Sequence, residues 1–184
     1  MHPGPRNPAN SGDEAKDSSL ADRLVSLCLL HGRFTLRSGT VANQYFDKYL
    51  FEARPDLLRE VAEAAALLVP PDTQVLAGLE LGGIPVATAL SLHTGLPAAF
   101  VRKTRKEYGT ERLAEGADVT GRHVLVIEDV ITTGGQVVES VAALRNEGAV
   151  VDHVLCIIDR SNGRATGISD AGLSLRAVIS LAAA

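Results

Sequence analysis

Two adjacent acids followed by a turn of small residues form the segment that is best equipped for chemistry. Segment 124–136 reads VLVIEDVITTGGQ, in which Glu128 and Asp129 end an apolar run and Thr-Thr-Gly-Gly at 132–135 opens a helical pattern. Glycines let backbone N–H groups close around a phosphate, threonine hydroxyls add donors, and the helix N-terminus adds partial positive charge. The pattern predicts a site for a 5'-phosphate with two carboxylates beside it.

The same residues have a plainer interpretation, in which Thr133 caps the helix and the two acids are solvated residues at the edge of a sheet. A Walker loop needs Gly-Lys-Ser/Thr and a dinucleotide fingerprint needs GxGxxG, and this segment has neither. Single acids at such an edge are common, whereas two acids directly before Thr-Thr-Gly-Gly are much rarer. We therefore favour the phosphate site.

A second group of candidates is the cationic run VRKTRKEYGT, which contains Arg102, Lys103, Arg105 and Lys106. The chain as a whole has a formal net charge of −4, so this run is a local concentration of positive charge. In a chain without a bulk positive field, an anion site must be local, and this run is a candidate for one. A solvated charged loop is the alternative. The acidic balance of the whole chain argues against binding of nucleic acid.

The elements around these segments alternate between strands and helices. Continuous apolar strands separated by helices indicate an α/β fold with a parallel sheet covered on both faces. Ligands of such sheets bind at the carboxyl edge, where the two acids end their strand. The predicted strands are 74–79, 98–102, 123–129 and 149–159, the predicted helices start at Ile84 and span 136–148, and a polar loop is predicted at 103–121.

The remaining segments predict a single domain at 18–184 after a disordered extension at 1–17. The extension is rich in Pro, Gly, Asn and Ser and shows no periodicity. The other predicted elements are a helix from Ser18 or Ser19 to Gly32, a hairpin around Ser38-Gly39, a helix from Pro55 until Pro70-Pro71 stops it, and a loop with a short strand after Arg160.

Composition limits the class of protein. The chain has 184 residues, of which 46% are hydrophobic and 22% are charged, which suits one globular domain rather than a disordered chain. The longest stretch without Lys, Arg, Asp or Glu, 81–101, is interrupted by Gly and Pro, and the N-terminus lacks the apolar core of a signal peptide. Cys28 and Cys156 lie in apolar surroundings, which predicts buried free thiols in a reducing cytoplasm. The five histidines show no metal-ligand spacing.

Segment 124–136 resembles the motif with which type I phosphoribosyltransferases bind 5-phosphoribosyl 1-diphosphate (PRPP). The resemblance implies an α/β fold with a mostly parallel twisted sheet flanked by helices, a small N-terminal hood at about 18–50 together with the C-terminal end, and a mobile catalytic loop. It also implies that Glu128 and Asp129 bind the ribose hydroxyls. The residues implied to hold the rest of the phosphoribosyl group are Val130, Ile131, Thr132, Thr133, Gly134, Gly135 and Gln136.

Three further segments resemble orotate phosphoribosyltransferases, and the resemblance covers roughly residues 20–182. In the first, GRFTLRSGTVANQYFD, Arg37 takes the basic position and Tyr45 and Phe46 take the aromatic positions that recognise a pyrimidine. The family usually has Lys where Arg37 stands, so the charge is kept and the geometry changes. An amphipathic hairpin with a solvated Arg is the plainer alternative for this segment.

The second segment, VRKTRKEYGT, matches the mobile catalytic loop of these enzymes. The match assigns Arg102, Lys103 and Lys106 to the diphosphate of PRPP. Tyr108 stands where the family often has His, so a phenol that stays neutral near pH 7 replaces an imidazole, although it can still donate a hydrogen bond to diphosphate. The implied catalytic residues are Lys103, Lys106, Glu128 and Asp129.

The third segment, CIIDRSNG, contains Arg160, and the resemblance places Arg160 and Thr132 against the orotate ring and its carboxylate. A guanidinium opposite a carboxylate is the bidentate arrangement that would select orotate over uracil. Asp159 could instead neutralise Arg160 in a structural ion pair. The stretch GLELGGIPVA resembles the diphosphate-binding turn, but some members carry Lys where Gly82 stands, so this turn would bind through backbone N–H groups.

The resemblance implies an enzyme of pyrimidine (UMP) biosynthesis that converts orotate and PRPP into orotidine 5'-monophosphate and diphosphate. Mg²⁺ would be carried by PRPP, with no metal bound directly by the protein. The expected assembly is a cytoplasmic homodimer whose catalytic loop is shared between subunits, with no nucleic-acid or membrane partner. Two alternatives stay open, a type I phosphoribosyltransferase for another base and a PRPP-sensing regulator with the same fold. Retention of Lys103, Lys106 and both acids favours catalysis.

Overall fold

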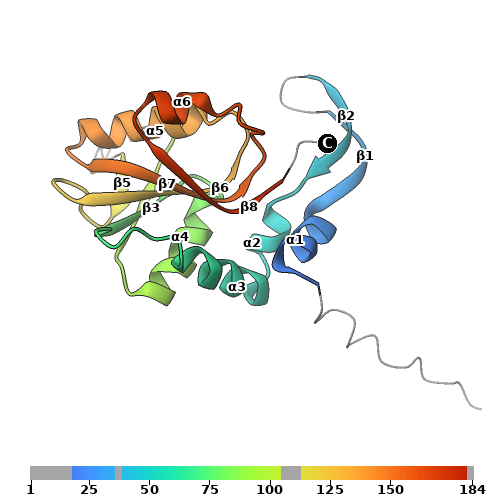
Figure 1. The fold of residues 1–184 in the computed structure, drawn as a ribbon, viewed down its shortest axis with the longest axis horizontal. Coiled ribbons are helices and arrows are strands. Elements are labelled where there is room, and N and C mark those ends of the chain that lie inside the picture. Colours follow the sequence, from blue (N-terminus) through green and yellow to red (C-terminus); the bar gives the residue numbers. More distant parts are fainter. Residues whose placement is uncertain (1–17, 36–38, 105–112, 182–184) are drawn as a thin grey trace, which may run out of the picture.

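A computed structural model describes residues 18–35, 39–104 and 113–181, and Figure 1 shows their arrangement. A six-stranded sheet forms the centre, and a two-stranded hairpin stands beside it. The helices are α1 (Leu20–Cys28), α2 (Tyr49–Glu52), α3 (Pro55–Ala66), α4 (Gly83–Thr94), α5 (Gly135–Asn146) and α6 (Thr166–Asp170). The strands are β1 (Leu29–Thr35), β2 (Val41–Phe46), β3 (Val75–Leu79), β4 (Ala98–Val101), β5 (Ala114–Gly116), β6 (His123–Ile131), β7 (Val150–Asp159) and β8 (Ser174–Ser180).

The six strands of the large sheet lie in the order β5-β4-β3-β6-β7-β8. Five of them are parallel to one another, and the short β5 at one edge pairs antiparallel with β4. The predicted mostly parallel sheet is therefore confirmed. From β3 the chain moves outward to β4 and β5, whereas from β6 it moves outward in the other direction to β7 and β8. The strand order thus reverses between β3 and β6, which is the place where sheets of this kind bind ligands.

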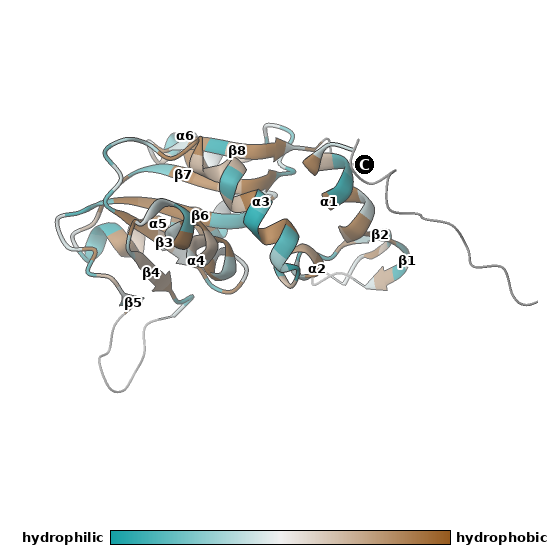
Figure 2. Cartoon of the chain, turned by 90° about the horizontal axis from the view of Figure 1, so that it is seen from below, coloured by the Kyte–Doolittle hydropathy of each residue, from teal (hydrophilic) through white to brown (hydrophobic). Residues whose placement is uncertain are grey.

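Helices cover both faces of this sheet, with α3 and α4 on one face and α5 and α6 on the other (Figure 1). Consecutive residues of β6 point to opposite faces, so Val124 and Val126 share a buried cluster with α5, whereas Leu125 and Ile127 share one with α3 and α4. In Figure 2 the central strands are mostly hydrophobic (brown), whereas α1 and α3 have both hydrophobic (brown) and hydrophilic (teal) residues. Apolar packing from both sides therefore holds β6 in place.

The N-terminal part of the predicted hood contains α1, β1, β2 and α2, which are called the hood below and lie beside the sheet (Figure 1). Ser19 Oγ accepts a hydrogen bond from Asp22 N at 3.1 Å and so caps α1, as the predicted helix start requires. β1 and β2 pair antiparallel, which confirms the predicted hairpin, although the turn at 36–38 lies outside the described residues. Because α1 contributes buried residues to the same apolar cluster as α3 and α4, the hood is anchored to the core.

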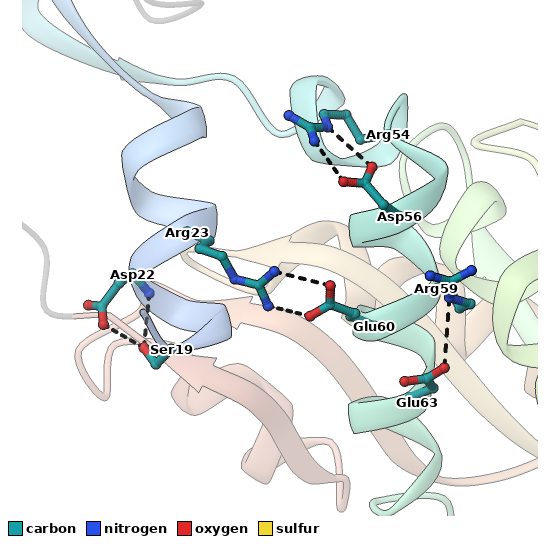
Figure 3. A network of polar contacts seen from close by, with 8 residues as sticks. All are labelled: Ser19, Asp22, Arg23, Arg54, Asp56, Arg59, Glu60 and Glu63. Atoms are coloured by element: carbon teal, nitrogen blue, oxygen red, sulfur yellow. Dashed lines mark hydrogen bonds and ion pairs between the residues drawn. The ribbon is translucent and has the colours of Figure 1, made fainter. Parts of the chain in front are cut away.

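Ion pairs add to the contact between the hood and the core, as Figure 3 shows. Arg23 of α1 reaches across to Glu60 of α3, with both terminal guanidinium nitrogens on the carboxylate. Such a bidentate pair defines the orientation of the two helices as well as joining them. Arg54 and Asp56 form a separate exposed pair at the start of α3, with 2.6 Å between nitrogen and oxygen.

The first two long helices end earlier than the sequence predicts. The predicted first helix runs to Gly32, but α1 ends at Cys28 because the next two residues pair with β2 as a strand. Pairing between strands overrides the helical spacing of the leucines here. The second predicted helix, α3, ends at Ala66, before Pro70-Pro71 is reached.

Three short elements and one strand end also differ from the prediction. β5 lies inside the predicted polar loop 103–121, and it forms by pairing with β4 although three residues carry no usable periodicity. α2 and α6 have four and five residues, which is too short for a helical pattern to show. The strand of the acids continues to Ile131 instead of ending at Asp129, because β7 pairs with it as far as Asp159.

Close backbone packing at the start of α4 gives a prediction about stability. A Cβ on Gly83 would lie 2.3 Å from the carbonyl oxygen of Ile127 in β6. We expect Gly83→Ala to lower the free energy of unfolding by about 2 kcal/mol or more, because backbone must move to accept the methyl group. Gly167→Ala is the matched control, since its Cβ would meet nothing closer than 3.9 Å. Urea unfolding measures both variants, and equal losses would contradict the packing of α4 on β6.

Candidate active site at the carboxyl edge of the sheet

The carboxyl edge of the sheet collects side chains from four parallel strands. Because the strands are parallel, their carboxyl ends meet on one side of the molecule, around the point where the strand order reverses. Segments far apart in the sequence come together there. The residues at or just beyond the strand ends are Gly82 after β3, Arg102 and Lys103 after β4, Glu128 and Asp129 on β6, and Arg160 after β7.

The phosphate turn, residues 132–135, joins β6 to α5. Gly134 is the N-cap residue of α5 and has a φ of +77°, a left-handed conformation that favours glycine. A Cβ at this position would also come within 2.9 Å of the Ile168 side chain. Among the described residues no side chain caps α5, so the structure contradicts the alternative in which Thr133 is the helix cap.

The phosphate turn is open on its outer side. Thr132, Thr133, Gly135 and Gln136 are exposed, and together with Glu128 they border a cavity of about 100 Å³. The first backbone N–H groups of a helix have no partner within the helix, and its N-terminus carries partial positive charge. Hydroxyls, N–H groups and this charge suit a phosphate. The geometry is thus compatible with the predicted phosphate site, whose occupancy stays a prediction.

Asp129 is the most enclosed acid of this edge. Its side chain is fully buried, and Lys48 Nζ lies 2.6 Å from its Oδ2 atom. Its Oδ1 atom accepts a hydrogen bond from Val130 N at 2.6 Å. Glu128 is only half-buried, accepts a hydrogen bond from Asp129 N at 3.0 Å, and borders the phosphate cavity. The two acids therefore differ: Glu128 reaches the cavity, whereas Asp129 lies behind it and is tied to the hood.

Lys48 and Glu52 are site residues that the sequence analysis misses. Lys48 is the N-cap residue of α2 and Glu52 is its last residue, so the four-residue spacing brings both to one side of a helical turn. Glu52 is buried, with 9% of its surface exposed. The spacing is a weak signal that the two act together. Nothing in the sequence indicates that they meet Asp129, which lies far along the chain.

The backbone after β3 lies directly against these carboxylates. A Cβ on Gly82 would fall 1.5 Å from Asp129 Oδ2 and 2.7 Å from Glu52 Oε1. No side chain fits there, so this position needs glycine for a close approach between backbone and acids. Binding of diphosphate through N–H groups of this turn stays a prediction.

Burial and crowding shift the pKa values of this acidic cluster. Burial, followed by the hydrogen bond with Asp129, raises the pKa of Glu128 to about 9. Burial and the charge of Asp129 raise the pKa of Glu52 to about 8. Burial opposes the charged form of Asp129, but hydrogen bonding from Glu128 and the Lys48 ammonium outweigh it and lower the pKa of Asp129. Near neutral pH the cluster therefore contains an ionised Asp129, while Glu52 and Glu128 retain protons.

Arg160 and Phe46, which the resemblance assigns to the pyrimidine, lie together in the structure. The guanidinium carbon of Arg160 is 5.3 Å from the centre of the Phe46 ring. Arg160 N donates a hydrogen bond to Ile131 O at 2.8 Å, which places it beside the start of the phosphate turn. Asp159 accepts a hydrogen bond from Ser161 N at 2.8 Å, and no ion pair joins Asp159 to Arg160 in the described part of the chain. The alternative role of Arg160 in a structural ion pair therefore has no support.

The other predicted site residues are only partly described. Tyr45 is exposed, and its ring centre lies 5.6 Å from that of Phe34. Lys103 is exposed and Arg102 half-buried, directly after β4. Three predicted site residues lie outside the described residues, namely Arg37, Lys106 and Tyr108.

Outside this edge the structure agrees with the prediction for the cysteines. Cys28 and Cys156 are buried and free, and burial raises the pKa of both thiols, that of Cys28 to about 11. Across residues 18–35, 39–104 and 113–181 no three acidic, histidine or cysteine side chains are arranged to hold a metal ion. Within the same ranges, none of the helices combines the length and the apolar character that crossing a membrane requires.

Comparisons with known sequences agree on one family. A family model described as phosphoribosyl transferase domain matches residues 51–171. The chain is 55% identical over 166 residues to an orotate phosphoribosyltransferase from a Nocardioides species, covering 90% of this chain and 93% of the relative. It is 39% identical over 148 residues to an orotate phosphoribosyltransferase from Methanocella arvoryzae, covering 80% of this chain and 85% of the relative.

Solved structures agree with this assignment. The orotate phosphoribosyltransferase of Mycobacterium tuberculosis H37Rv in complex with PRPP is 34% identical with a TM-score of 0.75, over 88% of this chain and 94% of that chain. An adenine phosphoribosyltransferase from Thermoanaerobacter pseudethanolicus, 16% identical over 89% of this chain and 100% of that chain with a TM-score of 0.68, is alike in fold alone. The predicted type I phosphoribosyltransferase fold is confirmed. The chain belongs to the phosphoribosyltransferase family and, within it, to the orotate phosphoribosyltransferases.

Proposed function

We propose that this chain transfers the 5-phosphoribosyl group from PRPP to orotate, which gives orotidine 5'-monophosphate and diphosphate in pyrimidine biosynthesis. The observation that carries the proposal is the meeting of three groups at one edge of the sheet: the phosphate turn, the acids of β6 and the Arg160–Phe46 pair. A reaction that joins a ribose 5-phosphate to a carboxylated ring needs a partner for the phosphate, the ribose and the ring. The edge offers one for each.

The acids of β6 act on the ribose. Glu128 is the acid that borders the cavity, and it is placed to accept a hydrogen bond from a ribose hydroxyl. Asp129 lies directly behind it, buried and ionised. As the bond from C1 to diphosphate breaks, the ribose gains oxocarbenium character, and negative charge beneath the ring stabilises it. The low dielectric around a buried carboxylate strengthens this interaction.

The cations of this edge act on the leaving group. Arg102 and Lys103 follow β4 at the carboxyl edge, and Lys106 and Tyr108 in segment 105–112 complete the set by resemblance. These groups hold the diphosphate and neutralise charge as it leaves. When bound to PRPP, Mg²⁺ would offset the charge of the diphosphate. We assign no direct protein ligand to the ion.

The hood and the strand end of β7 bind the base. The Arg160 guanidinium meets the orotate carboxylate in a bidentate pair, and its contact with the Phe46 ring restricts its orientation. Arg37, Tyr45 and Thr132 form the rest of the base site. Uracil has no carboxylate, so it would leave the guanidinium without a partner.

The net charge and the cysteines indicate the partners and the cellular compartment of the reaction. The net charge of −4 does not suit a nucleic-acid partner, and the substrates are small anions. The buried free thiols of Cys28 and Cys156 suit a reducing compartment, which for this chain is the cytoplasm.

Selection of the base tests the role of Arg160. We expect diphosphate release from PRPP and Mg²⁺ with orotate, and about a hundredfold or more lower kcat/KM with uracil, because only orotate fills the guanidinium site. Arg160→Ala should lower kcat/KM for orotate by a similar factor and change PRPP binding little. Arg122→Ala, which removes an exposed arginine before β6, is the matched control. Equal efficiency with uracil, or equal loss of orotate and PRPP binding, would contradict the assignment.

A homodimer that shares its loop is the proposed assembly. Segment 105–112 connects β4 to β5, the two strands at the outer edge of the sheet, and β3 separates them from β6. The loop therefore starts well to the outside of the acids. From there Lys106 can serve the active site of a neighbouring subunit.

Mixed dimers test this sharing. We expect activity to return when inactive Lys106→Ala protein is re-paired at random with an inactive double variant, Glu128→Gln with Asp129→Asn. About half of the dimers are then hybrids, each with one site built from an intact loop and intact acids, so about a quarter of all sites regain activity. Activity that stays flat across mixing ratios, with hybrids confirmed by mass spectrometry, would place Lys106 in the active site of its own subunit.

A further inference from the structure

A single turn of helix in the hood contacts the buried acid of the active site with two side chains. Lys48 and Glu52 stand at the two ends of α2, and both reach Asp129. Lys48 Nζ lies 2.6 Å from Asp129 Oδ2, and the Lys48 side chain keeps 30% of its surface exposed. Neither residue belongs to the set that the resemblance assigns to PRPP or orotate. The contact of Lys48 and Glu52 with Asp129 therefore needs a separate explanation.

The carboxylates of Glu52 and Asp129 approach the same point beside the backbone of Gly82. One point, the Cβ position of that glycine, lies 1.5 Å from Asp129 Oδ2 and 2.7 Å from Glu52 Oε1. Glu52 Oε1 is buried and receives no hydrogen bond from any described residue. A proton on Glu52 that is shared with Asp129 Oδ2 would give Glu52 Oε1 a partner. Two buried carboxylates beside a single ammonium, which pairs with Asp129, favour such sharing, because both cannot be charged at low cost.

The charges around Glu52 and Asp129 favour a proton shared by the two carboxyl groups. The titratable groups that act on this cluster are Lys48, Glu128, Asp47 and Tyr49, and Lys48 is the cation among them. The pKa of Asp129 is lowered and that of Glu52 is raised to about 8, so the proton stays on the Glu52 side. Asp129 can then remain ionised inside the protein.

We propose that Lys48 and Glu52 are positioning residues for Asp129, with Lys48 holding the carboxylate in its charged form and Glu52 donating a hydrogen bond that fixes its orientation. The inference rests on the proposed function, because it gives a role to residues that support the ribose-binding acids. It also links the two halves of the site. Phe46, which contacts Arg160, precedes Lys48 by two residues, so the end of β2 and the start of α2 brace the base site and the ribose site together.

Removing the ammonium tests the first part of the proposal. We expect Lys48→Met to lower kcat/KM for PRPP by about tenfold or more near neutral pH, because an unpaired Asp129 takes up a proton. A carboxylate that must be charged works better as pH rises, so the loss should be larger near about pH 6 than near about pH 8. Arg54→Met is the matched control, since it breaks an exposed ion pair just beyond α2 and should change nothing.

Chemical rescue distinguishes the ammonium from simple packing. Lys48→Cys treated with 2-bromoethylamine regains a lysine-like side chain with sulfur in place of one methylene. The Lys48 position is partly exposed to the reagent, whereas Cys28 and Cys156 are buried. Wild-type protein treated in parallel shows whether those two thiols react. We expect the rescued protein to recover most of the lost activity.

The carboxyl partner is tested by a pair of substitutions at one position. Glu52→Gln keeps a neutral hydrogen-bond donor and should stay within about threefold of wild type, whereas Glu52→Met removes the donor and should lose about tenfold or more. Equal losses in these two variants would overturn the role given to Glu52. Unchanged or increased kcat/KM in folded Lys48→Met, or no recovery after aminoethylation, would overturn the role given to Lys48.

A readout without turnover separates this proposal from the proposed function. Carbon-13 NMR titration of the aspartate carboxyls reports the charge of Asp129 directly. We expect its midpoint to rise by about one pH unit or more in Lys48→Met. If wild-type protein shows no turnover with orotate and PRPP, the proposed function fails, and the titration still decides the positioning role. A midpoint that does not move would overturn that role even in an active enzyme.

Discussion

The site depends on keeping one carboxylate charged inside the protein. Asp129 is fully buried, and taking a carboxylate out of water costs several kcal/mol unless it is paired and hydrogen-bonded. Lys48 supplies the opposite charge, Val130 N supplies a hydrogen bond, and the missing side chain at Gly82 leaves room for Oδ2. Without these contacts the acid would take up a proton and lose the charge that an oxocarbenium-like ribose needs.

The fold provides what this carboxylate requires. β6 lies at the reversal of strand order with an apolar cluster on each face, so packing from both sides holds its end in place while half-buried Glu128 borders the cavity at the phosphate turn. The phosphate turn continues directly from this strand into α5. The hood then folds against the same edge and brings α2 onto Asp129 and Phe46 onto Arg160. A small addition to the sheet therefore completes both the ribose site and the base site.

The parts of this structure that are encoded locally could be predicted from the sequence. β3, β6 and β7 are long apolar runs, α3 and α5 show helical spacing, and the phosphate turn follows its two acids without a break. The roles of Lys48 and Glu52 could not be predicted, because they depend on the hood packing against a strand far along the chain. The early end of α1 has the same origin, since pairing of Leu29 with Phe46 decides it. Contacts between distant segments produce no hydrophobic periodicity from which they could be predicted.

The turnover number of Asp129→Asn with orotate, PRPP and Mg²⁺ tests the central claim most directly. Asparagine keeps the shape of the side chain and removes its charge, and circular dichroism can check that the fold is retained. Asp170→Asn, at an exposed position on α6, is the control. The account predicts a loss of about 2 to 4 kcal/mol of transition-state stabilisation, or roughly 30- to 1,000-fold in kcat. An unchanged kcat in folded Asp129→Asn protein would contradict it.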